Sequence, residues 1–189
     1  MGIIRLYEIC PEAEKAGVEN AVVTGVTDNT AEVKQGSIFV CVKGARFDGH
    51  SAAAEMLSKG AVMIVTDHDI KCGKQLVTDN TRLCLARLLN CFYGKPSEKL
   101  GLLAVTGTNG KTTTAHFVKH ILTTLGKKCG CVGTAGNDTY SGELKPSQHG
   151  TPTVPRATVL YSWLGEMVSN GADYCVMEAS SQALDQYRI

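Results

Sequence analysis

The sequence predicts an α/β protein of two domains, each built around parallel strands. Short apolar runs alternate with segments of helical spacing along most of the chain, which is typical of strand–helix units in a parallel sheet. Residues 94–99 are polar and include glycine and proline, a composition typical of linkers. We therefore expect a small N-terminal α/β domain over residues 1–93 and the first, incomplete part of a parallel-sheet domain over residues 100–189.

The first domain is predicted to contain three short strands and two helices. A helix over residues 51–59 should end at Gly60, a natural helix stop. A second helix over residues 81–92 is amphipathic, with Asn80 or Asp79 as its N-cap. The apolar runs that predict strands are residues 37–42, 61–66 and 75–77.

The second domain is predicted to begin with a buried strand at Leu102–Val105, which is wholly apolar. A helix follows it and includes residues 116–125, with Phe117, Val118, Ile121 and Leu122 on one side. Residues 136–151 are expected to form a polar loop. The other elements are a strand at residues 129–132, a helix at residues 157–170 and a strand at residues 174–177 that ends in Glu178.

Composition and charge argue against several classes of function. The 189 residues include 19 Lys and Arg and 18 Asp and Glu, so the net charge is +1. A chain with so little excess positive charge does not have the strongly basic character typical of proteins that bind nucleic acid or an anionic membrane. The apolar runs are far shorter than a membrane span, and the N-terminus lacks a signal-peptide pattern. We expect a cytoplasmic monomer with no nucleic-acid or membrane partner.

The eight cysteines and five histidines form no zinc-binding pattern in the sequence. No Cys-x-x-Cys pair is present, and Cys129 and Cys131 are expected to point to opposite faces of a strand. His116 and His120 lie four residues apart, which on a helix could hold a metal, but no acidic or cysteine partner accompanies them. Reduced thiols in a cytosolic protein are therefore expected.

The most informative motif lies between the strand at Leu102–Val105 and the helix that follows it. Its two glycines let the backbone curl so that successive N–H groups point at phosphate oxygens, and the helix N-terminus adds partial positive charge. The alternative is a glycine turn without a ligand, but the strand–loop–helix context favours ATP. Lys111 is the predicted catalytic residue, and the predicted ATP-binding residues are Thr106, Gly107, Thr108, Asn109, Gly110, Lys111, Thr112 and Thr113.

A magnesium ion is expected beside this loop. The Thr112 hydroxyl follows the lysine directly, in the position that holds Mg²⁺ in phosphate-binding loops. Glu178 ends an apolar strand, and in nucleotide-binding sheets such an acid binds Mg²⁺ directly or through water. Thr112 and Glu178 are therefore the predicted metal ligands, with Mg²⁺ as cofactor and ATP as substrate.

Two motifs resemble the Mur ligases, ATP-dependent enzymes that join amino acids to carboxylates. The run 106–114 is similar to their phosphate loop, and its three threonines after the lysine favour the peptidoglycan branch or cyanophycin synthetase. Residues 178–184 are similar to the Glu-Val-Ser-Ser-His-Ala-Leu motif of the UDP-N-acetylmuramoyl-tripeptide synthetases, with Gln182 in place of the histidine. The resemblance implies a UDP-binding N-terminal domain and a truncated P-loop ATPase domain of the Mur ligase type.

The resemblance also assigns substrate-binding residues in the second domain. Ser180, Gln186 and Arg188 match residues that contact the UDP-muramoyl dipeptide in that branch. Arginine presents a planar fork to carboxylate or phosphate, which suits this role. Thr153 aligns with the first threonine of the branch's Thr-Thr-Pro segment. Val154 replaces the second threonine, so only its backbone is expected to make a contact.

In the first domain, Thr30 takes the place of a serine that contacts UDP in these enzymes. Residues 43–50 match the Gly-x-x-x-Asp-Gly-His loop that encloses the uridine and the diphosphate. The basic Arg46 suits an anionic diphosphate. The predicted substrate-binding residues of this domain are therefore Thr30, Ala45, Arg46 and Phe47, and cyanophycin synthetase does not share this domain.

The resemblance implies ATP-dependent addition of a diamino acid to UDP-N-acetylmuramoyl-L-alanyl-D-glutamate in peptidoglycan synthesis, and hence a role in cell-wall formation and cell division. The partners are this dipeptide, ATP and either meso-diaminopimelate or L-lysine. Another Mur-type ligase, or a binding module without turnover, is the alternative. The family's second metal ligand, carbamoylated lysine and C-terminal domain fall beyond residue 189. We thus expect an inactive, poorly soluble fragment with an exposed sheet edge.

Overall fold

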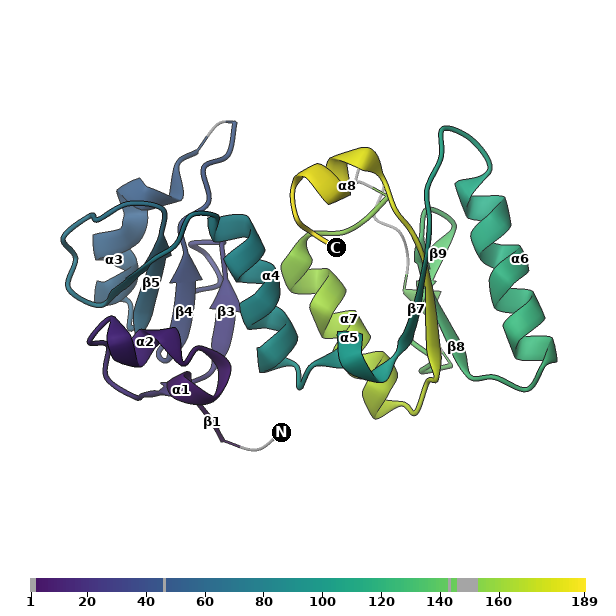
Figure 1. Ribbon diagram of the computed structural model, residues 1–189, viewed down its shortest axis with the longest axis horizontal. Coiled ribbons are helices and arrows are strands. Elements are labelled where there is room, and N and C mark those ends of the chain that lie inside the picture. The colour runs from purple at the N-terminus through teal and green to yellow at the C-terminus, as the bar shows by residue number, and fades with distance from the viewer. Residues whose placement is uncertain (1–2, 46, 143, 146–152) are drawn as a thin grey trace. The chain divides into compact units, whose positions relative to one another are not determined.

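The computed structural model describes residues 3–45, 47–142, 144–145 and 153–189. The chain forms two compact units, Met1–Phe92 and Tyr93–Ile189, and each contains a sheet with parallel strands (Figure 1). The predicted α/β class is therefore confirmed. Among the described residues, no helix combines the length and the apolar character that crossing a membrane requires. All eight cysteines have free thiols.

Four parallel strands form the main sheet of the first unit, in the order β3-β4-β5-β6. The predicted strands at residues 37–42, 61–66 and 75–77 correspond to β4, β5 and β6. The four strands are β3 (Gly25–Thr27), β4 (Ser37–Val40), β5 (Met63–Thr66) and β6 (Gln75–Val77). A separate antiparallel pair consists of β1 (Ile4–Arg5) and β2 (Val22–Val23).

The described residues of this unit form five helices. The longest has the predicted bounds, and the Asn80 side chain caps it by accepting a hydrogen bond from the Leu83 N–H at 2.9 Å. Gly60 follows the helix predicted at residues 51–59 and has a positive φ of 100°, which suits its role as a stop. The helices are α1 (Leu6–Ile9), α2 (Glu12–Lys15), η1 (Gly49–Ala52), α3 (Ala53–Ser58) and α4 (Thr81–Phe92).

The sheet of the first unit is buried on both faces. Phe39 and Ile64 pack with Met56 of α3 on one face. Their neighbours Ile38 and Met63 are fully buried as well, and they point to the other face because side chains alternate along a strand. Helix α4 contacts β3, β4 and β5 and supplies the second layer. This packing fixes the carboxyl ends of β4 and β5, where two polar loops begin.

The second unit has a five-stranded mixed sheet in the order β10-β9-β8-β11-β7. Strands β8, β11 and β7 are parallel, whereas β9 and β10 are antiparallel to their neighbours. The strands are β7 (Gly101–Val105), β8 (Cys129–Gly133), β9 (Gly136–Asp138), β10 (Leu144–Lys145) and β11 (Tyr174–Glu178).

The prediction of a polar loop over residues 136–151 is wrong for the first part of this range, because β9 and β10 lie there. Gly133 pairs with Gly136, which has a φ of 135°, so β8 and β9 form a tight hairpin. The buried Asn137 accepts a hydrogen bond from the Gly133 N–H at 3.2 Å. This bond satisfies a polar side chain that the sequence pattern places in a loop.

Helices lie on both sides of the second sheet (Figure 1). Met177 packs with Leu160 and Leu164 on the α7 side, whereas Val176 packs with Ala115 on the α6 side. Within the predicted linker at residues 94–99, residues 96–99 form a helix that contacts β7 and α7. The helices are α5 (Pro96–Lys99), α6 (Lys111–Thr124), α7 (Ala157–Ser169) and α8 (Ser181–Asp185).

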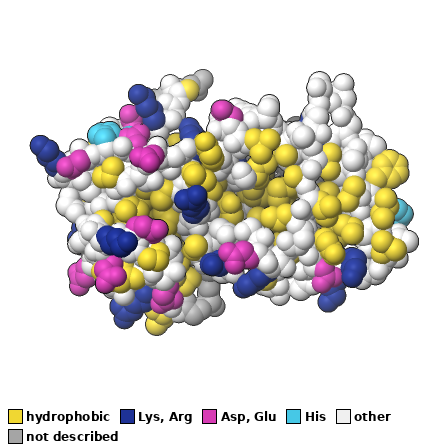
Figure 2. Space-filling model, viewed as in Figure 1, with side chains coloured by type: hydrophobic (Ala, Val, Ile, Leu, Met, Phe, Trp, Pro, Cys, Tyr) yellow, Lys and Arg dark blue, Asp and Glu magenta, His cyan; other side chains and the backbone are white. Residues whose placement is uncertain are grey.

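Strand β7 lies at the edge of its sheet, so the prediction that it is buried is wrong. Leu102 and Leu103 are exposed, and so are apolar residues along one stripe of α6: Phe117, Ile121 and Leu125. Hydrophobic side chains gather between β7 and α6 on the visible face (Figure 2). Only Val118 and Leu122 of the predicted apolar side pack inward. The expected exposed edge and apolar surface are thus confirmed, and poor solubility stays a prediction.

Candidate functional site

The predicted phosphate loop connects Val105, the last residue of β7, to Lys111, the first residue of α6. Gly107 and Gly110 have φ values of 143° and 77°, a region that side chains other than glycine rarely adopt. The Lys111 ammonium donates hydrogen bonds to the Gly107 carbonyl at 2.7 Å and the Thr108 carbonyl at 3.4 Å. The lysine therefore lies across the loop, where it can meet an anion.

Helix α6 presents its N-terminus to the same loop. It is 14 residues long, and the first N–H groups of a helix have no partner within the helix. Thr112 and Thr113 belong to its first turn, and the Thr112 side chain is half-buried. The aligned peptide dipoles and these N–H groups favour negative charge here. The loop and the helix together form an end of the unit whose geometry suits an anion.

Glu178 ends β11, and the pairing of strands brings it to this end of the sheet. β11 lies beside β7 in parallel, with Glu178 opposite Val105. The side chain is buried, and its two oxygens accept hydrogen bonds from the Thr134 N–H at 2.7 Å and the Thr134 hydroxyl at 3.2 Å. Gly133 leaves room for it, since a Cβ there would lie 2.3 Å from Glu178 Oε1. The carboxylate is thus fixed next to the strand that leads into the phosphate loop.

Three of the predicted substrate residues near the C-terminus are joined by hydrogen bonds. The Arg188 guanidinium donates hydrogen bonds to the Val154 carbonyl at 3.1 Å and to the Gln186 side chain. The Val154 side chain is buried, so its backbone oxygen makes the contact, and Thr153 beside it is half-buried. The Ser180 hydroxyl accepts a hydrogen bond from the Ala183 N–H at 3.2 Å and caps α8.

In the first unit, the predicted substrate residues occupy two turns. Thr30 is half-buried in the turn after β3. Ala45 and the exposed Phe47 lie in a hairpin that the Gly44 N–H closes by donating to the Phe47 carbonyl at 2.9 Å. Arg46 lies outside the described residues. Since β3 and β4 are parallel, both turns leave the same edge of the sheet.

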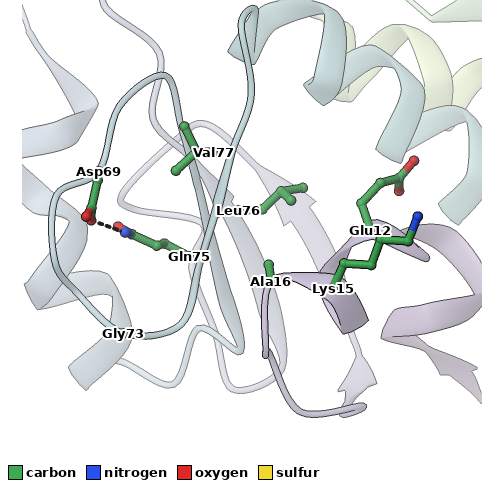
Figure 3. Close-up of a pocket in the computed structure, with 8 residues that line it drawn as sticks. All are labelled: Glu12, Lys15, Ala16, Asp69, Gly73, Gln75, Leu76 and Val77. Atoms are coloured by element: carbon green, nitrogen blue, oxygen red, sulfur yellow. Dashed lines mark hydrogen bonds between the residues drawn. The ribbon is translucent and has the colours of Figure 1, made fainter.

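An open hollow of about 570 Å³ in the first unit contains none of the predicted site residues. Helix α2 contributes Glu12 and Lys15, and β6 with its preceding loop contributes Gln75 (Figure 3). The Gln75 amide donates a hydrogen bond to Asp69 within this loop. The hollow holds no convergent set of polar groups aimed at a ligand, so it adds no candidate site.

The buried cysteines are poorly suited to nucleophilic chemistry. Burial raises the pKa of the Cys41 thiol to about 12 and that of Cys131 to about 11, and only the thiolate is an effective nucleophile. Burial likewise raises the pKa of Cys175. These thiols serve as small apolar core residues.

Comparison with known families matches the chain to two models in succession. The model of the Mur ligase family, catalytic domain, matches residues 22–106. The model of the Mur ligase middle domain matches residues 105–189. The two matches meet at the end of β7, where the phosphate loop begins.

Curated relatives are similar over most of the chain. The UDP-N-acetylmuramoyl-L-alanyl-D-glutamate–2,6-diaminopimelate ligase of Bacillus cereus is 40% identical over 90% of this chain and 34% of its own length. A second relative, the UDP-N-acetylmuramoyl-L-alanyl-D-glutamate–2,6-diaminopimelate ligase 2 of Clostridium acetobutylicum, is 37% identical over 90% of this chain and 36% of its own length. The chain thus spans about a third of the length of the curated relatives that it matches.

Solved structures show the same fold. A UDP-N-acetylmuramoyl-L-alanyl-D-glutamate–2,6-diaminopimelate ligase aligns with a TM-score of 0.76 and 24% identity, over 99% of this chain and 38% of that chain. The MurF ligase of Thermotoga maritima, in complex with ADP, aligns with a TM-score of 0.53 and 23% identity, over 82% of this chain and 32% of that chain.

The contact between Gly133 and Glu178 predicts a stability effect. Gly133→Ala should lower the free energy of unfolding by about 1–3 kcal/mol, because the added methyl group overlaps the buried carboxylate. Trp163 in α7 is the only tryptophan, so its fluorescence during urea denaturation reports on this unit. Glu178→Asp shortens the side chain and should recover part of the loss in the Gly133→Ala background. If Gly133→Ala lowers the free energy of unfolding by the same amount in the parent chain and in the Glu178→Asp variant, the contact between residue 133 and Glu178 is contradicted.

Proposed function

Since the chain belongs to the Mur ligase family, we propose that it binds the nucleotide and the UDP-sugar of an ATP-dependent ligase of peptidoglycan synthesis. The ligase adds a diamino acid to UDP-N-acetylmuramoyl-L-alanyl-D-glutamate. The observation that carries this proposal is the phosphate loop, with Lys111 across it and Glu178 at the end of the neighbouring strand. Cytoplasmic location and a monomeric state are part of the proposal.

The proposed reaction has two steps. The γ-phosphoryl group of ATP passes to the free carboxylate of the D-glutamyl residue, which gives ADP and an acyl phosphate. The amine of the diamino acid then attacks the acyl carbon, releases inorganic phosphate and loses a proton as the amide forms. Lys111 neutralises charge that develops on the transferred phosphoryl group, and the N-terminus of α6 orients it.

Thr112 and Glu178 suit a magnesium ion, since hydroxyl and carboxylate oxygens are the ligands that this ion prefers. The burial of Glu178 and its two hydrogen bonds from Thr134 hold one carboxylate in place. When bound, Mg²⁺ supplies positive charge to the β- and γ-phosphates. Lys111 and Thr112 position the nucleotide beside it.

Ser180, Gln186, Arg188, Thr153 and Val154 are proposed to bind the muramoyl dipeptide. Arg188 already bonds the Val154 carbonyl and Gln186, so these three residues share one location. Thr30, Ala45, Arg46 and Phe47 are proposed to bind the UDP moiety. Both curated relatives described above are named for 2,6-diaminopimelate, which favours meso-diaminopimelate over L-lysine.

Lys111→Ala should weaken the binding of Mg²⁺–ATP to the chain by about 1.5–3 kcal/mol, because it removes a charged hydrogen bond to phosphate. Titration with a fluorescent ATP analogue measures this change. The matched control is Lys127→Ala, which removes an exposed lysine of the same unit and should leave the affinity unchanged. Equal affinities of Lys111→Ala and the parent chain would refute the loop assignment. In the longer enzyme, Lys111→Ala should abolish phosphate release but spare UDP-sugar binding.

Arg46→Ala should weaken the binding of UDP-N-acetylmuramic acid by about 1.5–3 kcal/mol if its guanidinium bonds the diphosphate. Calorimetry on the whole chain measures this affinity. Arg87→Ala, which removes an exposed arginine of α4, is the matched control and should bind like the parent. The absence of any uridine-dependent heat from the folded parent chain would count against the assignment of the first unit.

A further inference from the structure

Two histidines and two aspartates meet at the edge of the first sheet where β4 and β5 end. Asp48 and His50 lie at the start of η1, in the segment that follows β4. Asp67 and His68 directly follow β5. The rings of the two histidines lie 4.8 Å apart between centroids. One ligand atom each from His50, Asp67 and His68 lies within 4.8 Å of the others.

His50 is the fixed member of this cluster. Its side chain is only 10% exposed, and Nδ1 lies 2.5 Å from Asp48 Oδ1. Nε2 is buried and lies 3.2 Å from Asp67 Oδ1, yet it forms no hydrogen bond with any described residue. A nine-tenths buried ring thus aims an unsatisfied nitrogen at the carboxylate of Asp67.

The short contact between His50 Nδ1 and Asp48 leaves a lone pair on His50 Nε2. An ionised carboxylate only accepts hydrogen bonds, so the short contact with Asp48 places the His50 proton on Nδ1. On the other side of the cluster, Asp67 Oδ1 lies 2.5 Å from His68 Nδ1. With the proton on Nδ1, the lone pair of His50 Nε2 faces Asp67 Oδ1 at 3.2 Å, and a cation between these two atoms would be bound by both.

The geometry suits a tetrahedral ion. Zinc lies about 2.0–2.2 Å from nitrogen and oxygen ligands, which places neighbouring ligand atoms of a tetrahedron about 3.3–3.5 Å apart. The observed separation of His50 Nε2 and Asp67 Oδ1 is 3.2 Å. A histidine that binds a metal through one ring nitrogen usually donates a hydrogen bond from the other nitrogen to a carboxylate or carbonyl. Asp48 is placed to accept this bond from His50 Nδ1. His68 is exposed, with 61% of its side chain accessible, so its ring can turn toward the ion.

We propose that His50 Nε2, the Asp67 carboxylate and a ring nitrogen of His68 bind a divalent transition metal of the zinc class. Two imidazoles and one carboxylate favour such an ion over Mg²⁺ or Ca²⁺, which prefer oxygen ligands. Water completes the coordination on the exposed side. The ion links the segment after β4 to the segment after β5, and so it holds the bridge between Lys43 and Asp48 against the sheet.

The direct test is calorimetric titration of the whole chain with Zn²⁺, and with Co²⁺ followed by visible absorption. The parent chain should bind one ion at this cluster, with the absorption of a four-coordinate cobalt site. His68→Ala removes an exposed ligand without disturbing the core. Loss of an outer-shell partner costs about 10–100-fold in metal affinity, so His68→Ala should weaken binding by at least that range, and Asp48→Asn by about that range.

The matched control is the double variant His116→Ala/His120→Ala, which removes two exposed histidines four residues apart on α6. It should bind Zn²⁺ and Co²⁺ like the parent chain. Three results would overturn the proposal: no saturable binding by the parent, unchanged affinity of His68→Ala, or loss of binding in the α6 control. The first result would indicate that the contacts of His50 with Asp48 and Asp67 hold the cluster together without a metal. Circular dichroism of each variant checks that the fold is retained.

Discussion

The parallel pairing of β7 with β11 is the constraint on which the proposed nucleotide site of the second unit depends. Its register sets Glu178 opposite Val105, and Val105 is the last residue before the phosphate loop. Parallel strands end at a common edge, so a loop after one strand and an acid at the end of the other become neighbours. The hairpin of β8 and β9 then holds the acid, because Thr134 follows β8 and bonds both carboxylate oxygens. The proposed roles of Lys111 and Thr112 rely on this arrangement.

Features set by local chemistry could be predicted from the sequence. Helix α4 begins and ends at the predicted residues, because Asn80 caps it and its apolar spacing is regular. The positive φ of Gly107 and Gly110 follows from the turn that a phosphate loop requires. The strand that delivers Glu178 is also present where its apolar run predicts it. The functional roles of these residues stay predictions, because sequence patterns and strand order do not measure binding.

Features set by distant contacts could not be predicted in this way. Leu102 and Leu103 have the apolar pattern of a buried strand, yet they are exposed, and β7 is the edge strand of the sheet that the described residues form. The polar Asn137 lies in a strand because its side chain bonds the Gly133 N–H. His50 and His68 are far apart in the sequence and show no motif of metal ligands. They come together only because they follow two neighbouring strands, β4 and β5. Arg46 lies outside the described residues, so its role rests on the motif alone.

The most direct test of the nucleotide site is a crystal structure of the chain with Mg²⁺ and a non-hydrolysable ATP analogue. The phosphates should lie along residues 106–111, with the γ-phosphate in contact with the Lys111 ammonium. The metal should lie between the Thr112 hydroxyl and the Glu178 carboxylate, directly or through one water. Phosphates bound elsewhere, or a metal that contacts neither Thr112 nor Glu178, would contradict the view that the pairing of β7 with β11 builds this site.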